Sequence, residues 1–85
     1  MKLPLIKHID NFIESRDVDF AHEAVELLEH ITEFSQLSDE ELNVVGELIS
    51  NIYGAIEVNA LKQAGSSQKE ALSSFMARVM GSIDK

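Results

Sequence analysis

Residues 37–65 read LSDEELNVVGELISNIYGAIEVNALKQAG, and this stretch decides the fold. It opens with the spacing of a capping box, in which the hydroxyl of Ser38 accepts the amide hydrogen of Glu41 and the glutamate accepts that of the serine. Nothing interrupts the helical pattern before Gly65, a residue type suited to the position just after a helix. We therefore predict a long helix over 39–64, roughly 39 Å in length at 1.5 Å per residue.

This third helix is too long and too apolar for a small globule. A compact chain of 85 residues has a diameter on the order of 30 Å. The apolar residues of the helix also cover about half of its circumference, more than the ~100° stripe that one neighbouring layer buries. We expect this arc to form a homodimer. The alternative is a compact monomer whose third helix bends or breaks at Gly54. The residues expected to form the contact are Leu48, Ile52, Tyr53, Ile56, Phe75 and Val79.

Apolar residues at spacings of three and four predict three further helices. They cover residues 4–15, 20–35 and 68–81, with Pro4 in the first turn of the first and Gly81 at the end of the last. The last helix begins with a second capping box, Ser67 and Glu70. No run alternates with a period of two, so we predict an all-α fold. We expect a small four-helix bundle in which residues 1–85 form a single helical domain around the long third helix.

Composition excludes several classes of protein. The chain has no cysteine, which removes disulfides, thiolate metal sites and cysteine nucleophiles. Its net charge of −8 argues against a nucleic-acid partner. No segment approaches the ~20 apolar residues of a membrane span, and polar residues interrupt the N-terminal segment before an export signal could form. We expect a cytoplasmic protein.

The acidic residues are concentrated in one part of the chain. All but two of the fifteen acids, but only one of the seven bases (Arg16), fall within residues 8–61. This part of the chain presents either a solvated acidic surface or a face that would bind a basic protein partner.

One set of residues has the chemistry of a metal site. His22, Glu26 and His30 share a face of the second predicted helix at spacings of four, and such residues are competent ligands for zinc, iron or manganese. The face lies opposite the apolar stripe, however, so the simpler interpretation is a solvated acidic surface. Ser66 and Lys69 have the spacing of a serine nucleophile and its lysine, but helix capping explains this segment. We expect no cofactor.

Two segments resemble a known family. Residues 37–58 and the ending FMARVMGSI, residues 75–83, resemble a family of short uncharacterised bacterial proteins of the Bacteroidetes type. The resemblance covers nearly the whole chain and implies a stand-alone helical protein without an assigned activity.

Together these patterns predict a small non-enzymatic protein that acts through self-association and protein–protein contact. The alternative is a helical bundle that binds a metal or a small ligand through His22, Glu26 and His30.

Overall fold

The computed structural model describes residues 2–83, with side chains described for residues 2–80. The described residues form four α-helices and no strand: α1 (Leu3–Ser15), α2 (Val18–Ile31), α3 (Asp39–Gln63) and α4 (Gln68–Ile83). The all-α prediction is confirmed, and α3 is the longest helix, as its sequence indicates.

Both ends of α3 form as predicted. The Ser38 hydroxyl accepts the amide hydrogen of Glu41 at 3.1 Å, and the Glu41 carboxylate accepts that of Ser38 at 2.9 Å. At the other end, Gly65 has a φ of +116°, and the amide of Ser66 donates to the carbonyl of Leu61 at 3.1 Å. This geometry closes the last turn of a helix and requires the left-handed backbone conformation that glycine adopts easily. The chain is helical throughout Asp39–Gln63, so the alternative of a helix broken at Gly54 is wrong.

Three helix boundaries differ from the prediction by two residues or more. Helix α2 starts earlier than predicted, at Val18, because the Asp17 carboxylate accepts the amide hydrogen of Asp19 at 3.0 Å. It stops at Ile31 instead of residue 35, since the Thr32 hydroxyl donates to a carbonyl of the last turn and the chain continues in tight turns. Helix α4 continues past Gly81 to Ile83. An interior glycine costs only about 1 kcal/mol, which a helix tolerates.

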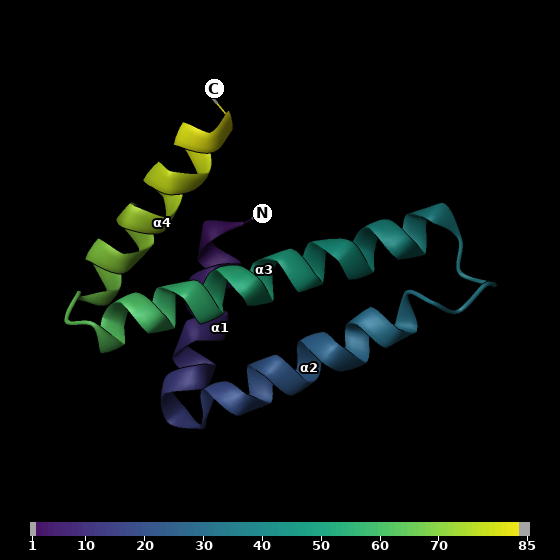
Figure 1. Ribbon diagram of the computed structural model, residues 1–85, viewed down its shortest axis with the longest axis horizontal. Helices are drawn as coiled ribbons and strands as arrows, with labels where there is room; N and C mark the ends of the chain where they lie inside the picture. Colours follow the sequence, from purple (N-terminus) through teal and green to yellow (C-terminus); the bar gives the residue numbers. More distant parts are fainter. Residues whose placement is uncertain (1, 84–85) are drawn as a thin grey trace.

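The arrangement of the helices is open and thin. Helices α2 and α3 lie side by side as a hairpin, while α1 and α4 contact the C-terminal half of α3 (Figure 1). The molecule measures 43 × 35 × 17 Å, so it is about two helices thick. Its radius of gyration is 13.8 Å, against about 12 Å for a compact chain of this length. One half of the hairpin therefore extends beyond the other two helices.

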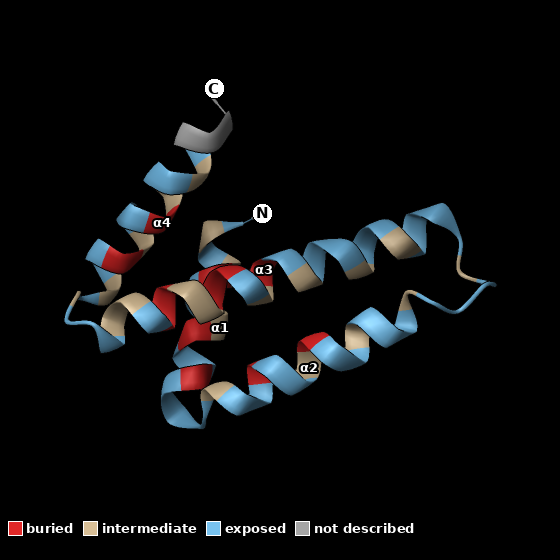
Figure 2. Cartoon of the chain, in the orientation of Figure 1, coloured by how far each residue is buried: buried red, intermediate tan, exposed pale blue. Residues whose placement is uncertain are grey.

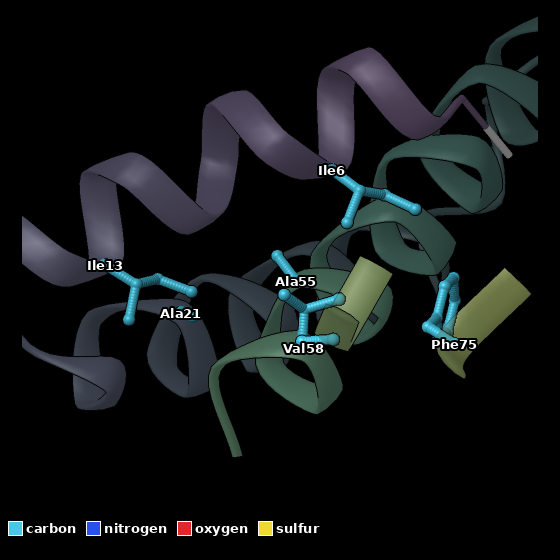
Figure 3. Packing of buried hydrophobic residues seen from close by; sticks show 7 residues of the cluster. Ile6, Ile13, Ala21, Ala55, Val58 and Phe75 are labelled. Atoms are coloured by element: carbon cyan, nitrogen blue, oxygen red, sulfur yellow. The ribbon is translucent and has the colours of Figure 1, made fainter. Parts of the chain in front are cut away.

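The core lies where α1, α3 and α4 meet, and it continues to Ala21 of α2 beside Ile13 (Figure 3). Ile6 of α1, Val58 of α3 and Phe75 of α4 are each exposed by 2% or less. Gly54 lets the helices approach closely, because a Cβ atom there would lie 2.9 Å from Ile6 Cδ1 and 3.0 Å from Phe75 Cζ. Farther along α4, Arg78 donates two hydrogen bonds to the Glu57 carboxylate. The core is thus confined to one end of the hairpin.

Candidate functional site

The predicted metal ligands lie on the surface. His22, Glu26 and His30 are all exposed along α2. Within residues 2–80, no group of three or more histidine, aspartate or glutamate side chains is placed to hold a metal ion. The structure does not bring these three side chains together as a ligand set.

The six predicted contact residues do not form one surface. Phe75 is 2% exposed and belongs to the core, and Ile52, Ile56 and Val79 are half-buried against it. The expectation that Phe75 contacts another chain therefore needs correction, because α1 and α4 cover the C-terminal half of α3 within the same chain. Only Leu48 and Tyr53 are largely open, at 41% and 49% exposed.

A polar cluster joins three helices at one side of the core. The buried carboxylate of Asp10 on α1 accepts hydrogen bonds from Lys62 of α3 at 2.7 Å and from Gln68 of α4 at 2.8 Å. Lys62 also pairs with the exposed Glu14. Burial lowers the pKa of Lys62, but the hydrogen bonds and charges of the two carboxylates outweigh it, so the pKa is raised. This cluster holds the lysine charged and ties α1 to the start of α4.

One stripe of α3, apolar except at Asn51, is covered over only part of its length. Residues 44, 48, 51, 55 and 58 follow each other at spacings of three and four, and so share a face. Asn51, Ala55 and Val58 are buried, whereas Val44 is 60% exposed and Leu48 is 41% exposed. In Figure 2 the buried residues of α3 all lie in its C-terminal half, and its N-terminal half is mostly exposed. The same face thus turns from core to open surface between Asn51 and Leu48.

Helix α2 carries a matching exposed stripe. Ala21 and Val25 are buried, but Phe20 is 54% and Leu27 is 62% exposed. These two exposed side chains share one face with Ala24 and Ile31, at spacings of three and four. The two open stripes lie on adjacent helices, and we call their uncovered part the hairpin surface. It consists of the exposed side chains of Leu27, Ile31, Val44 and Leu48 and of Ala24, which is half-buried.

Helix α1 borders the hairpin surface. Leu5, Ile9 and Phe12, which we call the α1 flank, line a recess of about 380 Å³ together with Ala24 and Leu48. A second recess, of about 370 Å³, lies between the N-terminal end of α1 and the middle of α3, and Val44 and Leu48 line it. The hairpin surface and the α1 flank therefore meet at an inner corner, which is the candidate site of this protein.

Sequence patterns alone located only part of this corner. The spacing of Phe20, Ala24, Leu27 and Ile31 identifies them as one face of α2, but a helical wheel gives no information on whether another helix covers that face. The sequence does carry one signal for an open face. The predicted helices have more apolar stripes than two crossing helices can bury.

One protein-family model covers nearly the whole chain. The model of a family of unknown function, DUF6952, matches residues 1–84. The chain belongs to this family. The prediction of an uncharacterised family is thereby confirmed, and a bacterial source of the Bacteroidetes type stays a prediction. Comparisons with curated proteins and with solved structures gave no match. None of the described helices is long and apolar enough to cross a membrane.

Proposed function

We propose that this member of the family acts without catalysis, by associating with itself through the hairpin surface and the α1 flank. The observation that carries the proposal is the apolar stripe of α3, which is buried at Val58 and open at Val44. Water-exposed apolar patches of this extent on a soluble protein typically mark a contact surface.

The total exposed area supports this proposal. The chain exposes 5937 Å², whereas a folded monomer of its mass, 9.5 kDa, exposes about 5,050 Å². The excess of about 900 Å² is close to the roughly 800 Å² that each partner buries in a stable interface of standard size. A dimer that covers the inner corner would bring the exposed area per chain close to that of a compact protein.

The chemistry of the corner favours binding over catalysis. The recess of about 380 Å³ is lined by ten residues, of which His8 is the only one with an ionisable side chain. Acid–base and nucleophilic catalysis need at least two converging polar groups, one of them positioned by the other. Apolar side chains with few polar groups are instead typical of the centre of a protein–protein contact. We also propose a cytoplasmic location, because the chain lacks cysteine.

Light scattering over a wide range of concentrations tests self-association. We expect a mass near twice 9.5 kDa for the unmodified chain. Leu48→Asp places a charge on the hairpin surface and should give a monomer that keeps its helical circular dichroism. Ala60→Asp is the matched control, since Ala60 is exposed on the same helix outside the hairpin surface. A monomer at every concentration, or a Leu48→Asp variant as dimeric as the control, would contradict the proposal.

A further inference from the structure

We infer that the two copies join by a two-fold arrangement in which α1 of each copy lies on the hairpin surface of the other. This inference rests on the proposed self-association and specifies the partner element that covers the site. It places the two α1 helices next to each other between the two α2–α3 hairpins.

The chain itself shows which kind of element fits this groove. Ile6 of α1 already lies in the core with Ala55 and Val58 of α3, and Ile13 lies beside Ala21 of α2 (Figure 3), so α1 crosses the hairpin over the C-terminal half of the stripe. The uncovered half continues the same groove over residues 39–48, about 15 Å along the helix axis. Helix α1 has 13 residues and is therefore about 20 Å long. A second α1 is long enough to cover what the first leaves open.

The shape of the molecule allows this only in one orientation. The hairpin and the layer of α1 together fill the 17 Å of the shortest dimension, since packed helix axes lie 8–10 Å apart. The α1 flank therefore rises from the hairpin surface by about one helix diameter. If the hairpins of the two copies point in opposite directions, α1 of each copy lies on the uncovered hairpin surface of the other copy. If the two hairpin ends faced each other directly, both α1 helices would collide and the hairpin surfaces would stay apart.

The distribution of charge favours the same orientation. Glu40 and Glu41 line a recess at the free end of the hairpin together with Val44, and Glu33 lies beside Ile31 and Phe34. Two such ends placed face to face would bring like charges together. The chain just before α1 carries the opposite charge, because Lys2 lines the recess with Leu5. Opposite potentials on two facing surfaces fix the register of a complex.

The absence of cysteine from the chain makes disulfide mapping a direct test. One copy carries His8→Cys, on the exposed side of α1, and an isotope-labelled copy carries Val44→Cys, on the hairpin surface. Both positions are exposed, and cysteine is a small residue that should disturb neither helix. The two copies are mixed, oxidised mildly and examined by intact mass. The control mixes the Val44→Cys copy with Glu26→Cys, at an exposed position of α2 outside the corner.

We expect the mixed disulfide between positions 8 and 44 to be the most abundant crosslinked species, and the control mixture to give little of the mixed product. A dimer that instead crosslinks position 44 to itself would overturn the inference, because the hairpin ends would then face each other. A dimer that forms neither product would overturn it as well. Light scattering of the same variants under reducing conditions separates these results from a failure of self-association, in which no dimer exists at all.

Discussion

Two glycines of α3 offer a sharp test of the packing described above. Gly46 and Gly54 are both interior to the same helix, but their surroundings differ. A Cβ atom at Gly46 meets nothing within 4 Å, whereas at Gly54 it would lie 2.9 Å from Ile6 Cδ1 and 3.0 Å from Phe75 Cζ. Ile6 is 0% and Phe75 is 2% exposed, so neither has free space to move into. The same substitution should therefore have opposite effects at the two positions.

The magnitudes follow from two opposing contributions. Alanine replaces glycine in a helix with a gain of about 0.5–1 kcal/mol, because the unfolded chain loses less conformational freedom. At Gly54 the added methyl group overpacks the core, at a cost of about 1–3 kcal/mol. We expect Gly46→Ala to raise the free energy of unfolding by up to about 1 kcal/mol, and Gly54→Ala to lower it by up to about 2 kcal/mol. In a chain of this size, 1 kcal/mol shifts the melting temperature by about 4–8 °C.

Urea unfolding followed by circular dichroism measures both variants, at one fixed protein concentration because association would add to the apparent stability. Each variant serves as the control for the other, since helix propensity contributes equally at the two positions. If Gly54→Ala stabilises the protein as much as Gly46→Ala does, then α1 and α4 do not approach α3 as closely as the structure shows, and the reasoning is refuted.

Three further predictions concern charged and titrating groups. Asp10→Ala should lower the free energy of unfolding by about 3 kcal/mol, which is the lower end of the range for breaking a buried ion pair. The lower end applies because the ammonium of Lys62 keeps a second carboxylate, that of Glu14. Chemical unfolding would show no such loss if the pair were unimportant. Burial and then the charge and hydrogen bond of Glu29 raise the pKa of Tyr53 above 10.0, so Glu29→Gln should lower it, and the absorbance of the chain's one tyrosine should report an unchanged pKa if the two groups do not interact. The hydrogen bonds of the N-cap residue Ser38 hold the pKa of Glu41 below 4.5. The contribution of Glu41 to stability is therefore present above pH 4.5 and is lost as the pH falls through the lowered pKa. Acid titration of Glu41→Gln should give a shallower loss of stability, and a slope equal to that of the unmodified chain would count against the capping box.

Local signals predicted the helices well because each one is contained in a few neighbouring residues. Ser38 and Glu41 define the start of α3 through hydrogen bonds over three residues, and Gly65 defines its end through backbone conformation. The predicted end of α2, at residue 35, is wrong, because the helix ends at Ile31. Phe34 continues the apolar spacing, but Thr32 competes for a carbonyl of the last turn through its hydroxyl, and the helical pattern does not show that competition.

The candidate site depends on packing between distant segments, which periodicity does not determine. The pattern identified Phe75 and Leu48 equally as apolar residues of a helix face. Their exposures of 2% and 41% differ because α1 and α4 contact one half of α3 and not the other. What decides this is a close approach at Gly54, between residues that lie about 20 to 50 positions apart in the chain. A single sequence does not show that these residues come close together in space.

The contact of Ile6 and Phe75 across Gly54 also affects how the chain is made. Helices α2 and α3 are neighbours in sequence, so their hairpin forms from local contacts while synthesis is still under way. The core cannot close in the same way, because the partners of Ile6 in α3 and α4 follow it in the chain only about 50 and 70 residues later. At about 5–20 residues per second, the buried face of α1 stays uncovered for several seconds in each round of synthesis.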